Sequence, residues 1–163
     1  MSPDLTSSAT SSKQVLREQC IELARSYIGA PWKHKGRSKS GIDCIGVPYV
    51  VGKELGLHDY DDSLDYGRQA KNFDFMRAMA PFGSRVKDLK DIRDADILVL
   101  RIPIFPQHVA MASHIGDRQT IIHASVEARK VVEEHLSDDV RRLLIAAFRY
   151  KEHYTTGAGE CVS

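Results

Sequence analysis

The sequence predicts an α+β domain in which N-terminal helices pack on an antiparallel sheet. In the first half of the chain apolar residues recur at helical spacing, whereas after Asp94 they form short segments rich in β-branched residues, separated by polar turns. Helices that precede strands in this way are typical of an α+β arrangement. The 163 residues suffice for one such domain with its own core.

The first predicted helix covers residues 13–28, where leucine, cysteine, alanine and tyrosine side chains follow the 3.6-residue period. Ser11 and, three residues later, Gln14 are typical of a capping box at its start. The preceding residues 1–12 are rich in Ser and Thr, and we expect them to form a flexible arm.

A polar, glycine-rich loop follows and ends at Asp43, after which the chain turns abruptly apolar. The stretch CIGVPYVVGKELGL, which starts at Cys44, predicts a second and largely buried helix. Pro48 is compatible with this helix only near its beginning, where a missing N–H group costs nothing. We therefore expect Cys44 in or just before the first turn, at the positive end of the helix dipole.

The remaining elements follow from shorter patterns. Residues 59–83 predict a loop and a short helix with one apolar face, and Ser137 followed by two aspartates is typical of a helix N-cap. Strands are predicted at 96–102, 108–113, 120–124, 130–134 and 146–150, the last of which closes the sheet. The expected organisation is an arm (1–12), one domain (13–150) and a C-terminal tail (151–163).

Composition excludes several classes of partner. A net charge of +1 predicts no nucleic-acid binding, and no apolar run is long enough to insert into a membrane. The N-terminus lacks the cationic and apolar regions of a secretory signal peptide, so we expect synthesis in the cytoplasm. The three cysteines, Cys20, Cys44 and Cys161, contain no CxxC pair, which argues against a disulfide framework or a zinc ribbon.

Cys44 is the candidate nucleophile. A thiol attacks carbonyl carbons as the thiolate, and a helix N-terminus, nearby cations and an imidazole all lower its pKa. The helix start and the basic loop of residues 33–39 supply the first two. His108 begins one predicted strand and His123 ends the next, so an antiparallel pair brings both imidazoles to one sheet edge. His108 is then the base and His123 the group that orients its ring.

Other interpretations of these residues stay open. A cysteine at a loop–helix junction also serves as a small buried hydrophobic residue. Paired histidines suggest zinc, but no carboxylate joins Cys44, His108 and His123 at a recognised spacing, so we expect neither a metal nor another cofactor.

The sequence also resembles a known family. The pieces ARSYIGAPWKHKGRSKSGIDCIG, DADILVLRI, HVAMA and IIHA stand in the order and spacing of the NlpC-type cell-wall cysteine peptidases. The resemblance covers residues 13–150 and implies a compact papain-like domain that cleaves peptide bonds in peptidoglycan stems, typically after γ-linked D-glutamate. The closing AAFRY resembles the subgroup carried by tailed phages and related gene-transfer particles.

Matched position by position, the resemblance implies that Cys44 is the nucleophile, His108 the general base and His123 the third, orienting residue. Asp43 matches an acidic residue that helps to bind substrate. Trp32 stands where the family usually has a tyrosine whose hydroxyl assists at the oxyanion, a group that the indole lacks.

Further departures concern substrate selection. His34, the third expected substrate-binding residue beside Trp32 and Asp43, replaces a usual tryptophan, and Lys35 a glycine. Ile45 replaces a serine that helps to hold a free amino terminus of the stem peptide, and the loss of that hydroxyl weakens the argument that this protein requires a free L-alanine end. In Asp94-Ala95-Asp96, only the last residue of the family's Pro-Gly-Asp is retained.

The resulting hypothesis is a cysteine peptidase or amidase that hydrolyses peptidoglycan stem peptides at the cell wall, with phage-tail proteins as further partners. Two alternatives are an acyltransferase or thioesterase that keeps the triad, and a tail-tip structural protein whose triad is idle.

Overall fold

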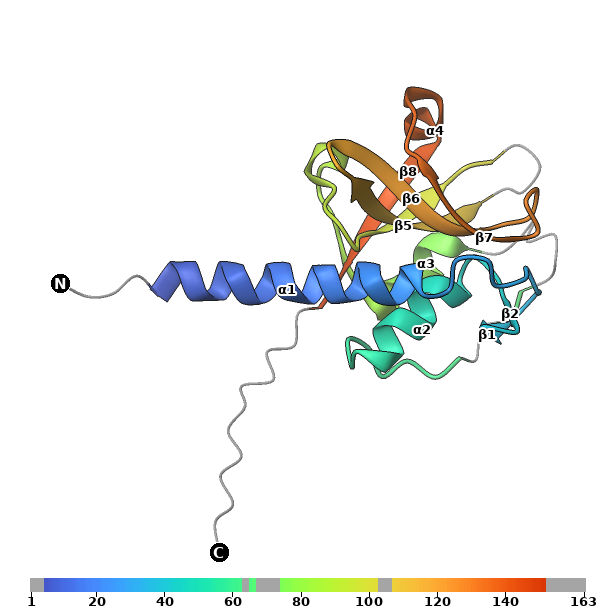
Figure 1. Ribbon diagram of the computed structural model, residues 1–163, viewed down its shortest axis with the longest axis horizontal. Coiled ribbons are helices and arrows are strands. Elements are labelled where there is room, and N and C mark those ends of the chain that lie inside the picture. Colours follow the sequence, from blue (N-terminus) through green and yellow to red (C-terminus); the bar gives the residue numbers. More distant parts are fainter. Residues whose placement is uncertain (1–4, 63–64, 67–73, 103–106, 152–163) are drawn as a thin grey trace, which may run out of the picture.

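The computed structural model describes residues 5–62, 65–66, 74–102 and 107–151, with side chains from residue 12 onward (Figure 1). Its α-helices are α1 (Leu5–Arg25), α2 (Gly46–Glu54), α3 (Phe75–Met79) and α4 (Asp138–Arg142), with 3₁₀ turns at Ala80–Phe82 and Leu89–Asp91. Its strands are β1 (Arg37–Ser38), β2 (Gly41–Ile42), β3 (Gly83–Arg85), β4 (Ile97–Leu100), β5 (His108–Ile115), β6 (Arg118–Ser125), β7 (Lys130–His135) and β8 (Leu144–Tyr150). The predicted α+β class is confirmed.

The main sheet has six strands in the order β3-β8-β4-β5-β6-β7, and every pairing in it is antiparallel. Strands β4 to β7 form the predicted meander, because each is joined to the next by a short connection. The last strand, β8, inserts beside β4, so the end of the domain pairs with its middle. The two-residue strands β1 and β2 form a separate small ladder in the glycine-rich loop.

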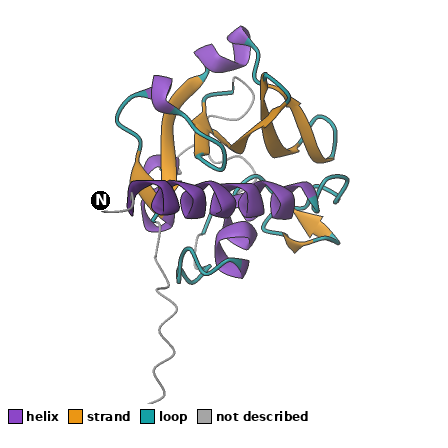
Figure 2. Ribbon diagram, turned by 60° about the vertical axis from the view of Figure 1, so that its left-hand side comes forward, coloured by secondary structure: helices purple, strands orange, loops and turns teal. Residues whose placement is uncertain are grey.

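The sheet has an apolar core on each face, as strand alternation requires. Ile97, Val99, Val109 and Met111 belong to the larger core beneath α1 and α2, whereas Leu98, Leu100, Ala110 and Ala112 belong to the smaller one. In Figures 1 and 2, α1 crosses the molecule between the six-stranded sheet on one side and α2 with β1 and β2 on the other.

The start of α1 differs from the sequence prediction, whereas the start of α2 agrees with it. Helix α1 begins at Leu5 rather than Lys13, so the predicted capping box at Ser11 does not mark its start. Serine and threonine cost only a few tenths of a kcal/mol each inside a helix, and extending a helix is far easier than nucleating one. Helix α2 begins at Gly46, which places Pro48 in its first turn as expected.

Candidate active site

Cys44 lies in the turn between β2 and α2, just before the first turn of the helix, as the sequence predicted. The glycines around it allow close packing. A Cβ atom on Gly46 would lie 2.6 Å from Ile42 Cγ1 and 2.7 Å from the carbonyl oxygen of Gly36. One on Gly41 would lie 2.7 Å from the side chain of Lys33. The motif Gly-x-Asp-Cys-x-Gly therefore folds the loop tightly against the helix start.

Asp43 holds this turn together. Its Oδ1 accepts hydrogen bonds from Gly46 N (2.9 Å) and Arg37 Nη1 (2.8 Å), and its Oδ2 accepts from Lys35 N (2.7 Å) and the Tyr66 hydroxyl (2.5 Å). The residue is 2% exposed. The carboxylate thus caps α2 and closes the basic loop on itself. Both oxygens of this expected substrate-binding residue are occupied by donors of the protein.

Arg37 extends the same network to a neighbouring segment. Its Nε donates to Asp62 at 2.7 Å and its Nη2 to the Tyr66 hydroxyl at 2.7 Å, in addition to the bond with Asp43. Burial disfavours its charge, but Asp43 and Tyr66 together raise its pKa above the ordinary value. Arg37 is one of the basic residues that we expected to activate Cys44, but its guanidinium is already paired with the carboxylates of Asp43 and Asp62.

The two predicted histidines meet at the end of the sheet where β5 begins and β6 ends. His108 Nε2 lies 2.7 Å from His123 Nδ1, with the ring planes at 82°, and both residues are 6% exposed. His123 Nε2 lies 2.5 Å from Glu134 Oε1 on β7. His123 pairs with Val132 and Ile121 with Glu134, so the carboxylate is a diagonal neighbour of the imidazole. The three side chains form one hydrogen-bonded chain across β5, β6 and β7.

Burial keeps both imidazoles neutral. It lowers the pKa of His108 to about 3, with a smaller contribution from His123. Burial also lowers the pKa of His123, although the Glu134 carboxylate acts in the opposite direction. At neutral pH each ring therefore carries one N–H group and one lone pair.

The Cys44 sulfur reaches β5 at the main chain of the residue after His108. The amides of Val109 and Ile45 favour its thiolate, but burial and the nearby Asp43 charge raise its pKa to about 12. The Ile45 amide at the helix start and the Arg37 cation do lower this pKa, as expected, but desolvation of the sulfur and the Asp43 charge outweigh them, so the expected net decrease is wrong. Its side chain is nevertheless partly exposed. Within the described residues no hydrogen bond joins the sulfur to either imidazole.

The other two predicted substrate residues lie beside the Asp43 network. Trp32 and His34 stack with ring centroids 6.5 Å apart, and His34 meets Tyr66 edge-on at 5.3 Å. Both are partly exposed. The main chain of Trp32 donates to the carbonyl oxygen of Arg129 at 2.9 Å, which fixes this segment beside the start of β7.

Three residues of the site escaped the sequence analysis: Arg37 as a partner of Asp43, Tyr66, and Glu134. Tyr66 follows Asp43 by 23 residues and no motif connects them. Glu134 had a detectable signal, since it lies on the strand after His123, two residues beyond Val132 and therefore on the same face as this partner of His123. The neighbouring Glu133 takes no part in this chain, because its carboxylate accepts hydrogen bonds from Arg25 and Thr120.

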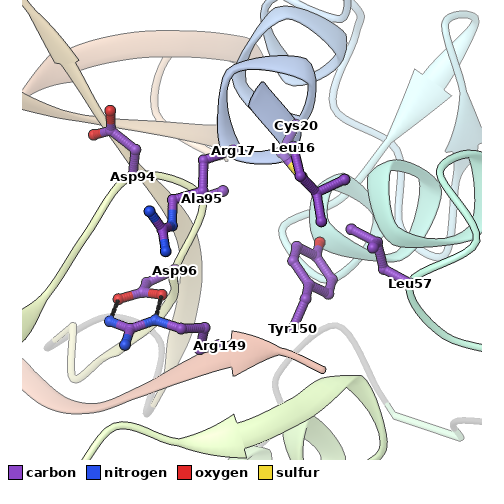
Figure 3. Close-up of a pocket in the computed structure, with 9 residues that line it drawn as sticks. All are labelled: Leu16, Arg17, Cys20, Leu57, Asp94, Ala95, Asp96, Arg149 and Tyr150. Atoms are coloured by element: carbon purple, nitrogen blue, oxygen red, sulfur yellow. Dashed lines mark hydrogen bonds and ion pairs between the residues drawn. The ribbon is translucent and has the colours of Figure 1, made fainter. Parts of the chain in front are cut away.

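A small cavity of about 20 Å³ lies elsewhere, between α1, Leu57 and β8 (Figure 3). Asp96 and Arg149 form a two-bonded ion pair at its wall, at 2.8 and 2.7 Å, and Cys20 lines it. Burial raises the pKa of the Cys20 thiol to about 12. Asp96, the one residue retained from the family's Pro-Gly-Asp, is thus a structural partner of β8. The cavity has room for about one water molecule and contains none of the predicted site residues.

Across the described ranges, no three His, Cys, Asp or Glu side chains converge to hold a metal ion. No helix among the same residues is long and apolar enough to cross a membrane.

No protein-family model and no curated protein sequence matches the chain. Solved structures do resemble it. The NlpC/p60 domain of the peptidoglycan hydrolase SagA has a TM-score of 0.55 at 22% identity, over 82% of this chain and 97% of that one. NlpC2 of Trichomonas vaginalis has a TM-score of 0.58 at 20% identity, over 83% of this chain. The peptidoglycan hydrolase RipB of Mycobacterium tuberculosis has a TM-score of 0.53 at 19% identity, also over 83%. The chain spans 46% and 65% of the latter two. It therefore has the fold of NlpC/P60 domains.

Proposed function

We propose that this chain is a cysteine peptidase of the NlpC/P60 type that hydrolyses amide bonds in the stem peptides of peptidoglycan. Two of its structural neighbours are peptidoglycan hydrolases by name, which supports this substrate class. The observation that carries the proposal is the chain His108–His123–Glu134, which begins at the point where the Cys44 sulfur contacts the main chain of β5.

In the proposed reaction, Cys44 and His108 are both neutral in the resting protein. As the amide carbonyl approaches, His108 accepts the thiol proton and the sulfur forms a bond to the carbonyl carbon. The imidazolium then gives the proton to the leaving amine as the C–N bond breaks. Water attacks the resulting thioester, again with His108 as base, and releases the peptide acid and the free thiol.

Backbone N–H groups at the start of α2 stabilise the oxyanion in this proposal. Such preorganised donors contribute on the order of 10²–10³ in rate each. Trp32, beside the same loop, has no hydroxyl for this role. The Gly46 amide is already bound to Asp43, so in this proposal the Ile45 amide, which lies at the Cys44 sulfur, carries more of the charge than in relatives with a tyrosine there.

The test uses purified peptidoglycan and two matched cysteine variants. Cys44→Ala abolishes the release of stem-peptide fragments, while Cys20→Ala, which removes a buried thiol that is not part of the site, retains it. Both variants keep the circular dichroism spectrum of the wild type. Fragment release by Cys44→Ala at the wild-type rate would refute the proposal.

The resemblance of AAFRY to the phage-tail subgroup supports a further proposal, that this domain reaches the cell wall as part of a phage tail or phage-like particle. The segment lies in β8, inside the sheet. Antibodies to the domain are expected to label the tail tip of such particles in electron micrographs. Label confined to the cell extract would contradict this delivery route.

The raised pKa of Cys44 favours one second candidate, a structural protein of the same fold whose triad is idle. A thiol with a high pKa stays protonated at neutral pH and is unreactive in many proteins. The two candidates differ in one outcome, namely whether a stem peptide acylates Cys44.

A further inference from the structure

We propose that Glu134 is a positioning residue that sets the order of protons along the histidine pair, so that His108 presents a lone pair to Cys44. This inference rests on the proposed function and adds a fourth member to the predicted Cys–His–His set.

The order starts at the carboxylate. An ionised Glu134 has only acceptor sites, so the nitrogen 2.5 Å from it, His123 Nε2, carries the hydrogen. A neutral imidazole has a single N–H group. His123 Nδ1 therefore holds a lone pair and accepts a hydrogen bond.

The same logic passes to the next ring. The acceptor on His123 Nδ1 lies 2.7 Å from His108 Nε2, which must then be the donor. The other nitrogen of His108, Nδ1, is left with the lone pair. Among the described residues no hydrogen bond to Nδ1 competes for it. It is the atom that takes the thiol proton in the proposed reaction.

The reverse order is equally compatible with the distances but not with catalysis. If His123 carried its hydrogen on Nδ1, His108 would accept at Nε2 and hold its own hydrogen on Nδ1. That nitrogen could not remove a proton from Cys44. The reverse order would also bring the Nε2 lone pair of His123 against the carboxylate, where two acceptors repel. The negative charge on Glu134 therefore selects the first of the two proton orders. This selection is the role that we assign to Glu134.

Glu134 can be changed without emptying the core, because its side chain is 54% exposed. Glu134→Gln keeps the size of the side chain but replaces the anion by an amide, whose NH₂ group can donate to His123 Nε2. The matched control is Asp94→Asn. Asp94 pairs with His114 Nδ1 at 2.5 Å, outside the proposed site, and His114 is 55% exposed.

The experiment records long-range ¹H–¹⁵N spectra of histidine-labelled protein at pH 7, which report the tautomer of each ring. In the wild type we expect His108 and His123 both as Nε2–H tautomers. In Glu134→Gln both rings gain the Nδ1–H form, while Asp94→Asn alters His114 alone. An Nδ1–H tautomer of His108 in the wild type, or unchanged tautomers in Glu134→Gln, would overturn the inference.

Kinetics on stem peptides add a readout that a merely structural role would not give. Glu134→Gln is expected to lower kcat at least about tenfold with little change in KM, since the base is in the wrong tautomer rather than displaced. A fall in kcat/KM through KM alone would contradict it. If the wild type cleaves no stem peptide, the proposed function fails, but the spectra still decide the proton order.

Discussion

His108 and His123, which are 15 residues apart in sequence, meet with Nε2 of the first 2.7 Å from Nδ1 of the second. Antiparallel pairing of β5 and β6 produces this contact, since the start of one strand lies beside the end of the next. Because the pair is buried and neutral, its properties differ from those of a preformed thiolate–imidazolium site, and several measurements follow from that difference.

The first prediction concerns stability in acid. The pKa of His108 is lowered from 6.5 to about 3 and that of His123 is also lowered, so at pH below about 6.5 the unfolded chain binds more protons than the folded one. The free energy of unfolding should therefore fall as pH decreases from 6.5 towards 3, by up to about 1.4 kcal/mol per pH unit for each group.

Urea unfolding at pH 7.5, 6, 5 and 4 checks this, with His108→Asn as the comparison. The variant should lose stability with a shallower slope, because one buried imidazole is gone, and the two proteins should differ least in slope above pH 7. Equal slopes for both proteins between pH 6 and 4 would show that His108 is not held neutral.

The second prediction concerns the reactivity of Cys44. With a pKa near 12, its thiol should react slowly with iodoacetamide at pH 7, and the rate should keep rising above pH 9. Cys44→Ser provides the background from the remaining thiols. A rate that is already at a plateau below pH 7 would instead indicate a thiolate–imidazolium pair.

The third prediction concerns the Asp43 network. Arg37→Met removes the cation from a nearly buried carboxylate and should lower the free energy of unfolding by about 3–5 kcal/mol. Lys35→Met is the matched control. Its ammonium pairs with the exposed Asp65 and lies 5.5 Å from the centre of the Tyr66 ring, and exposed ion pairs contribute little to stability. Similar losses for the two variants in urea unfolding would mean that Asp43 does not depend on Arg37.

The fourth prediction concerns Gly46. A methyl group there would overlap Ile42 and the carbonyl oxygen of Gly36, so Gly46→Ala should move the turn that carries Cys44. We expect a loss of about 1–3 kcal/mol in stability and a change in the alkylation rate of Cys44. Ser40→Ala, in the exposed part of the same loop, should change neither quantity. An unaltered alkylation rate in Gly46→Ala would show that Gly46 is not needed to position Cys44.

Much of this arrangement was predictable from sequence because it depends on local patterns. The β-branched segments after Asp94 determined the meander, and the position of Pro48 determined where α2 begins, so the place of Cys44 followed. The start of α1 did not follow, since Ser and Thr only weakly oppose a helix that is already formed.

The missing parts of the site depend on tertiary contacts. Nothing in the loop of residues 33–43 predicts that Asp62 and Tyr66 bind Arg37, because that pairing requires two loops to fold side by side. The pKa of Cys44 was predicted in the wrong direction for the same reason. Helix starts and cations are visible in a sequence, whereas desolvation depends on packing.

The most direct test of the central claim is the intact mass of the protein, quenched in acid within milliseconds to seconds after mixing with a synthetic stem peptide. The predicted result is a transient increase equal to the acyl portion of the peptide, located on Cys44 and lost in Cys44→Ala, with release of the corresponding amine. If no adduct forms at any time and the peptide stays intact after prolonged incubation, the proposed peptidase activity is contradicted. The result would then support the structural protein whose triad is idle.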